Sequence, residues 1–180
     1  MIWRIEVSEK EGIFDATGEG AKKDISEFGI KGVKAVRFIQ VYTIEDDLEQ
    51  DEAERIARES MDFLTKTLFI GGKLVPIGQE NWYVKGKVRS IYDQQPIEAA
   101  GMTTAYLKAF EKTGEEQYLK KARASFDWFL GKNSGNQVLY DESTGGCFDG
   151  LTRKGVNANQ GAESTISYLF ARLLISNNSN

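Results

Sequence analysis

The sequence predicts an α+β chain in which a small strand–helix–strand unit precedes a partial array of helical hairpins. Two observations indicate this class. Two segments before residue 45 are rich in β-branched and aromatic residues, whereas apolar residues after residue 50 recur at steps of three and four. The change falls at the acidic run "EDDLEQDE", so we expect one part over residues 1–50 and a second over residues 51–180.

The amino-terminal part is predicted to contain two strands and one helix. Residues 2–7, "IWRIEV", alternate their side chains between two faces, as a half-buried strand does. Residues 15–30 have the pattern of a short amphipathic helix ended by Gly29, and residues 33–44, "VKAVRFIQVYTI", return to strand. A sheet of two strands is only marginally stable alone. We therefore expect the helix to cover the sheet, with these side chains buried together: Ile5, Val7, Ile25, Phe28, Val36 and Phe38.

The second part is predicted to be mostly helical. Apolar residues at helical spacing predict helices over residues 50–67, 96–112 and 160–176. The run "TGEEQYLKKARASFDWFLGKN" predicts the second helix of a hairpin, with Thr113 and Gly114 in the turn. We expect the "FDWFLG" stripe within this run to pack in a core rather than to bind a ligand.

The composition limits the chemistry that the chain can perform. Its formal charge of -4, from 23 basic and 27 acidic residues, argues against a nucleic-acid surface. There is no histidine, so acid–base chemistry would depend on Asp, Glu, Tyr, Lys or the single Cys147, which we expect to be a small loop residue rather than a nucleophile. No metal site or cofactor is expected. The absence of a long apolar run predicts a soluble, cytoplasmic chain without membrane contact.

Two clusters of polar side chains stand in front of predicted helices. The first is in "YDQQPIEAAG", residues 92–101, and the second in "VNANQGAEST", residues 156–165. Carboxylates, amides and aromatic faces together are typical of pockets that hold sugar hydroxyls and pyranose rings, so we predict one shared site at the two helix starts. The catalytic candidates are Asp93, Glu98, Asp149 and Glu163, and the candidates for substrate binding are Trp82, Tyr83, Gln94, Gln95, Asn157, Asn159 and Gln160.

An ordinary structural role for the same residues stays open. Pro96 suits the first position of a helix, which makes Gln95 the N-cap and Glu98 a residue that can bond back to the cap amide. Glu163 can likewise favour the dipole of its helix. A hydrolytic site would need two carboxyl groups about 5 Å apart for retention, or roughly 6.5 to 9.5 Å apart for inversion. Binding without hydrolysis is equally compatible with the pattern.

Six runs between residues 56 and 175 resemble the carboxy-terminal helical domain, of six-hairpin (α/α) glycosidase type, of certain bacterial and archaeal glycosyltransferase-like proteins. These runs are "ARESMDFL", "LVPIGQENWYVKG", "YDQQPIEAAGM", "TGEEQYLKKARASFDWFLGKN", "LYDESTGGCFDGL" and "VNANQGAESTISYLFA". The resemblance implies a carbohydrate-associated domain that binds sugar or forms part of a glycosidase. A complete barrel of this kind has more helices than the four expected here. We therefore expect the chain alone to turn over no glycoside and to self-associate through apolar side chains such as Leu169, Phe170 and Leu173.

The first 55 or so residues are similar to the start of PurS, the small subunit of phosphoribosylformylglycinamidine synthase. The matching positions are Asp15, Gly18, Glu19, Gly29, Gly32, Val33, Val36 and Arg37. This similarity implies, as the alternative, a non-catalytic subunit that self-associates and bridges the glutaminase and synthetase subunits in purine synthesis. The two resemblances share one helix near residues 53–60, as expected of a natural fusion, a join made in cloning or a misassembled gene.

Two structural features would distinguish the two functions. Pairing of residues 68–75, which include two adjacent glycines suited to a tight turn, with residues 2–7 would favour the PurS-like role. Burial of Asp93 and Glu163 in one cleft would favour the carbohydrate role.

Overall fold

The computed structural model contains two compact units, Met1–Glu59 and Ser60–Asn180, each of which is described by itself. Helices and small antiparallel sheets together make the chain α+β, as predicted. The observed boundary between Glu59 and Ser60 lies within a helix, and the division expected between residues 50 and 51 lies at the start of that helix. The structure describes residues 2–8, 15–27, 29, 31–36, 39–45, 49–80, 83–84 and 86–178.

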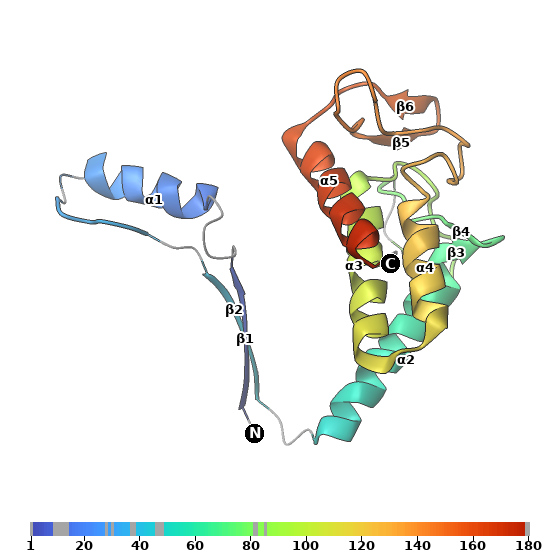
Figure 1. Cartoon of the computed structure of the whole chain (residues 1–180), viewed down its shortest axis with the longest axis horizontal. Helices are drawn as coiled ribbons and strands as arrows, with labels where there is room; N and C mark the ends of the chain where they lie inside the picture. Colours follow the sequence, from blue (N-terminus) through green and yellow to red (C-terminus); the bar gives the residue numbers. More distant parts are fainter. Residues whose placement is uncertain are drawn as a thin grey trace. The chain divides into compact units, whose positions relative to one another are not determined.

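The first unit contains two antiparallel strands, a helix between them in sequence and the start of a second helix (Figure 1). Strand β1 (Ile2–Ser8) pairs with strand β2 (Ile39–Glu45) along its whole length, and helix α1 (Ala16–Glu27) lies between them in the chain. The first strand and the helix confirm the prediction. The second strand begins at Ile39, and the described residues 33–36, which were expected to belong to it, have no regular structure.

Helix α1 begins and ends as its sequence predicts. Asp15 Oδ1 accepts a hydrogen bond of 2.7 Å from Gly18 N, which satisfies a free amide of the first turn. A β-carbon on Gly18 would lie 2.5 Å from Val36 O, so this position excludes larger residues. Gly29, with φ of 82°, donates its N–H to Ser26 O at 3.0 Å.

The predicted burial of the sheet against this helix can be followed at only two positions. Val36 and Ile25 are half-buried. The other side chains named for this packing, those of Ile5, Val7, Phe28 and Phe38, lie outside the described residues.

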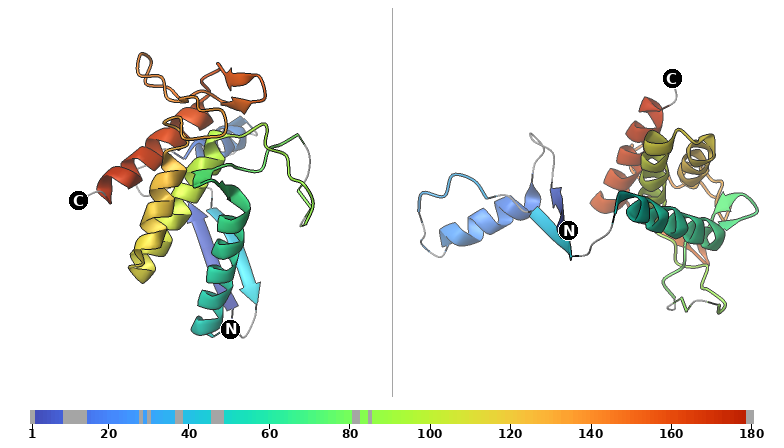
Figure 2. Two further views of the ribbon diagram at one scale, coloured as in Figure 1. Left: turned by 90° about the vertical axis from the view of Figure 1, so that its right-hand side faces the viewer. Right: turned by 90° about the horizontal axis from the view of Figure 1, so that it is seen from below.

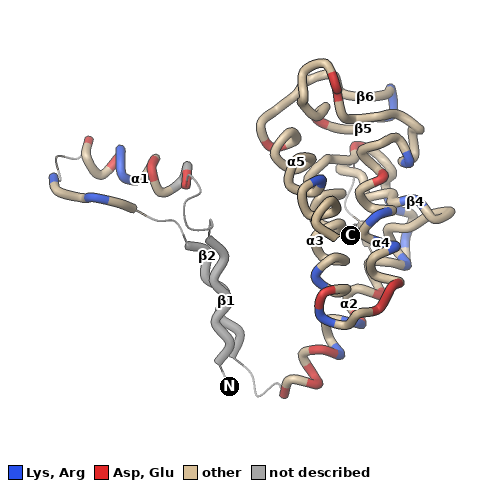
Figure 3. The backbone as a smooth tube through the Cα atoms, viewed as in Figure 1, with Lys and Arg blue, Asp and Glu red and all other residues tan. Residues whose placement is uncertain are grey.

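Helix α2 (Gln50–Leu68) confirms the helix predicted over residues 50–67. Acidic residues begin this helix and basic residues follow among further acidic ones (Figure 3), and Arg55 Nη1 lies 2.8 Å from Glu59 Oε1. The hairpin of β3 (Phe69–Ile70) and β4 (Lys73–Leu74) follows at once. Its strands pair with each other in a sheet of their own, and pairing of residues 68–75 with residues 2–7 stays a hypothesis.

Three helices pack together in the second unit (Figures 1 and 2). Helix α3 (Pro96–Thr113) packs against both α4 (Glu116–Phe126) and α5 (Ala162–Asn177), and Gly114 makes the predicted turn after α3 with φ of 69°. A short hairpin of β5 (Gly150–Thr152) and β6 (Gly155–Asn157) precedes α5; it was not predicted.

The core of this unit is aromatic. Trp128 and Phe129 are fully buried, which confirms the interpretation of the "FDWFLG" stripe as core packing. Tyr168 of α5 stacks on Tyr140 with ring centroids 4.4 Å apart and contacts Phe129 at 5.3 Å. These rings join α5 to the segment that follows α4.

Candidate functional site

Gln94, a predicted binding residue, is fully buried beneath the start of α3. Its Oε1 accepts a hydrogen bond of 2.8 Å from Trp128 Nε1, and its Nε2 donates at 2.7 Å to both Ser134 Oγ and Ile91 O. Its backbone exchanges two hydrogen bonds with Leu151 at 3.0 and 2.9 Å. The amide therefore has protein partners for its main donor and acceptor groups, and it fixes three segments of the second unit together.

The predicted capping arrangement is present at the start of α3. Glu98 Oε2 accepts a hydrogen bond of 2.9 Å from the Gln95 backbone N–H. Burial raises the pKa of the Glu98 carboxyl, and this hydrogen bond opposes the rise. Pro96 occupies the first position of the helix. Glu98 thus has the structural role that the sequence left open beside the catalytic one.

Asp149 caps helix α5 from the preceding loop. Its Oδ1 accepts hydrogen bonds of 2.7 Å from Gly161 N and from Ser164 Oγ. A β-carbon on Gly161 would lie 2.8 Å from the same oxygen, so the close approach depends on glycine. The carboxylate satisfies donors of the first turn in place of a cap residue within the helix.

The remaining polar residues before α5 form a network with a neighbouring loop. Gln160 Oε1 accepts a hydrogen bond of 2.8 Å from Thr144 Oγ1, and Gln160 Nε2 donates at 2.8 Å to Asp141 Oδ2. Hydrogen bonds from Ser143 and then from Gln160 lower the pKa of Asp141 to about 2. Asn157 Oδ1 accepts from Asn159 N at 3.2 Å, which closes a local turn.

The two predicted clusters are joined through a single short segment. Leu151 pairs with Gln94 in front of α3, and Asp149, two residues earlier, caps α5. Asp93 and Glu163, however, are both exposed, and neither lines the cleft described below. The burial of both in one cleft, which would have favoured the carbohydrate role, is therefore not found at that cleft.

Trp82 and Tyr83 are the two aromatic candidates for a sugar pocket. Trp82 lies outside the described residues, and Tyr83 is half-buried. A shared site at the two helix starts stays a prediction.

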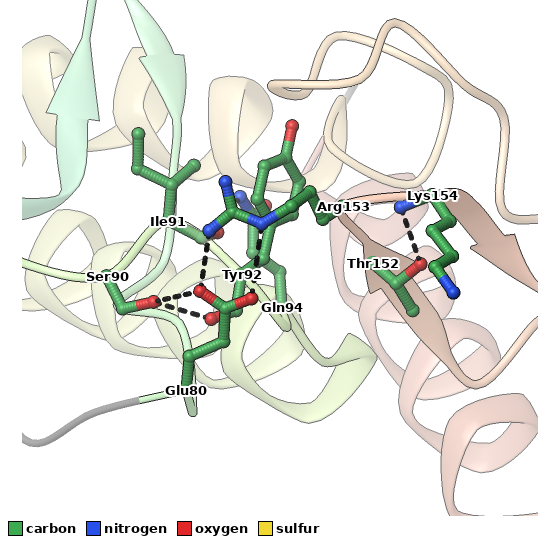
Figure 4. A network of polar contacts seen from close by, with 8 residues as sticks. All are labelled: Glu80, Ser90, Ile91, Tyr92, Gln94, Thr152, Arg153 and Lys154. Atoms are coloured by element: carbon green, nitrogen blue, oxygen red, sulfur yellow. Dashed lines mark hydrogen bonds and ion pairs between the residues drawn. The ribbon is translucent and has the colours of Figure 1, made fainter.

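The second unit contains a cleft of about 310 Å³ that the sequence did not reveal, and Figure 4 shows polar contacts among its lining residues. Across it, Arg153 Nη2 bonds to Glu80 Oε2 at 2.8 Å, and Ser90 Oγ donates to Tyr92 O at 2.6 Å. The hydrogen bond from Arg153 lowers the pKa of Glu80. The lining residues are Glu80, Val88, Arg89, Ser90, Ile91, Tyr92 and Arg153.

Cys147 is buried, and this burial, followed by the nearby Asp149 charge, raises the pKa of its thiol to about 12. The thiol is therefore protonated at neutral pH and is not a nucleophile, in keeping with the expectation of a small loop residue. Across the described part of the chain, no three Cys, Asp or Glu side chains gather as metal ligands. Nor does any described helix have the length and apolar composition needed to cross a bilayer.

The first unit has the architecture of a small β–α–β unit with a two-stranded antiparallel sheet. Residues 2–69 match the model of the PurS family, described as phosphoribosylformylglycinamidine (FGAM) synthase. The match extends beyond the expected end near residue 55 and includes the whole of α2. None of the curated proteins matches the chain. The resemblance of residues 56–175 to a six-hairpin glycosidase domain has no support in these comparisons.

Proposed function

We propose that residues 2–69 are a non-catalytic assembly segment that joins this chain to the glutaminase and synthetase subunits of phosphoribosylformylglycinamidine synthase. The match of these residues to the PurS family model is the observation that carries the proposal. It favours the function that the sequence offered as the alternative over the carbohydrate-associated one.

The geometry of the sheet is compatible with assembly. Within the described residues, β1 and β2 pair only with each other, so each strand has an outer edge of backbone donors and acceptors. A two-stranded sheet is marginal alone and gains stability when another strand is added at an edge. Association through such an edge needs no catalytic residue in this segment.

The test is binding of the whole chain to the purified glutaminase and synthetase subunits of the same organism, followed by light scattering. Val41 and Tyr42 are neighbours in β2, so their N–H groups face opposite edges. Of the two variants Val41→Pro and Tyr42→Pro, one therefore removes an N–H that faces β1 and breaks the β1–β2 pairing. We expect that variant to lose the complex. Ala158→Pro, in an exposed loop of the second unit, is the matched control and should bind normally. Absence of any complex, or binding by both strand variants as strong as that of the unchanged chain, would contradict the proposal.

A carbohydrate-binding role for the second unit is a second proposal. It is favoured by the exposed polar side chains of Asp93, Asn157, Asn159 and Glu163 near the starts of α3 and α5, two helices that pack together. We expect binding without hydrolysis, because these groups are open to water rather than held in a dry site. A screen of aryl glycosides and oligosaccharides should show no turnover. Hydrolysis that disappears in Glu163→Gln would instead establish a glycosidase.

A further inference from the structure

Arg89 carries a donor atom that the rest of the described chain leaves unused. The side chain lines the cleft, and its Nη1 donates a hydrogen bond of 2.6 Å to Val75 O. Its Nη2 is buried and has no hydrogen-bond partner. A buried donor of a charged group that stays unpaired is unfavourable, so a missing acceptor is indicated.

The charge of Arg89 is also without a counter-ion among the described residues. Glu80 is the acidic residue in the cleft lining, and its carboxylate is already engaged by Arg153 at 2.8 and 3.4 Å. Burial lowers the pKa of Arg89, but a guanidinium keeps its proton in proteins. The lining therefore has one carboxylate against two guanidinium groups, which leaves one positive charge.

From these observations we propose that the cleft binds a small organic anion through Arg89, with a carboxylate or phosphate group placed at Nη2. Either oxyanion supplies both the acceptor and the negative charge that this side chain lacks. Arg89 as a whole is half-buried, and the part of its side chain that stays accessible lines the cleft.

The other walls of the cleft define the rest of the ligand. The volume of about 310 Å³ is at the small end of ligand pockets. The centre of the Tyr92 ring lies 5.7 Å from the Arg153 guanidinium. A flat apolar ring and a second cation are therefore available in the same cleft as Arg89. Ser90 Oγ provides a hydroxyl near Glu80 (Figure 4). A single ring that carries one oxyanion fits these features.

Thermal unfolding of the full chain with added benzoate or phenyl phosphate tests this site, with benzyl alcohol as the neutral ligand of similar shape. We expect a saturable rise in Tm with one or both anions and none with the alcohol, and the comparison of the anions distinguishes carboxylate from phosphate. Inorganic phosphate at the same concentration shows whether the ring is needed. No rise with either organic anion overturns the proposal.

Two variants make the test specific to Arg89. Arg89→Met removes the charge and should weaken anion binding by at least roughly tenfold, while Arg123→Met, which removes an exposed arginine of α4, should leave it unchanged. Glu80→Gln frees Arg153 from its ion pair and should tighten binding several-fold. The latter variant keeps the proposal testable where Arg89→Met fails to fold. Equal binding by both arginine variants, or no gain in Glu80→Gln, would refute the site.

Discussion

Replacing Gln94 with alanine is expected to lower the free energy of unfolding of the second unit by about 3 to 5 kcal/mol. The change removes a fully buried side chain and three hydrogen bonds. It leaves the buried Trp128 Nε1–H without its acceptor and creates a cavity that Leu151 and Ser134 cannot fill without moving. Denaturant unfolding followed by tryptophan fluorescence measures the loss.

Gln79→Ala is the matched control, because Gln79 is exposed and a surface substitution of the same chemistry changes stability by less than about 0.5 kcal/mol. If Gln94→Ala were as mild as the control, the amide would not hold the unit together. Gln94 would then return to the set of ligand-binding candidates for which its sequence pattern first suggested it.

The helices could be predicted from sequence because their signals are local. The apolar spacing of residues 50–67 and the Pro96 start gave α2 and α3 to within a residue or two, and Gly114 lies in the left-handed conformation that its turn requires. The glycine pair before Lys73 also forms the predicted tight turn, with both φ angles positive.

The polar clusters could not be interpreted from sequence because a helix cap and a ligand site use the same residue types. Gln94 bonds to Trp128 across 34 positions, and Asp149 reaches Gly161 across 12. No local spacing shows such partners. The cleft was missed for the same reason: its central ion pair joins Glu80 to Arg153 across 73 positions, and no local spacing links the two residues.

The extent of strand pairing also could not be predicted from the local sequence pattern. Residues 33–44 have high strand propensity throughout, but the described residues 33–36 have no regular structure, and the strand that pairs with β1 begins at Ile39. The β5–β6 hairpin was missed because its two strands have three residues each, too few for an alternating pattern.

Helix α5 presents an apolar face that predicts self-association of the chain. Ile166, Leu169, Phe170 and Leu173 recur at steps of three and four and are therefore on one side of the helix, and Ile166 and Leu173 are 65% and 64% exposed. The opposite side, with Tyr168 and Ala171, is buried in the core. Helix α5 also carries few charges (Figure 3). A contiguous apolar face of this kind is typical of a contact between protein surfaces.

A second copy of the chain is the partner expected on this face, because two copies of one apolar stripe can cover each other by two-fold symmetry. Leu173→Glu should raise the dimer dissociation constant by at least roughly tenfold, since a carboxylate buried against apolar side chains is strongly unfavourable. Light scattering across a dilution series measures the shift. Gln117→Glu adds the same charge to an exposed position of α4, outside this face, and should leave the dimer intact. A chain that is monomeric at every concentration, or a dimer equally stable in both variants, would show that the α5 face is not the contact.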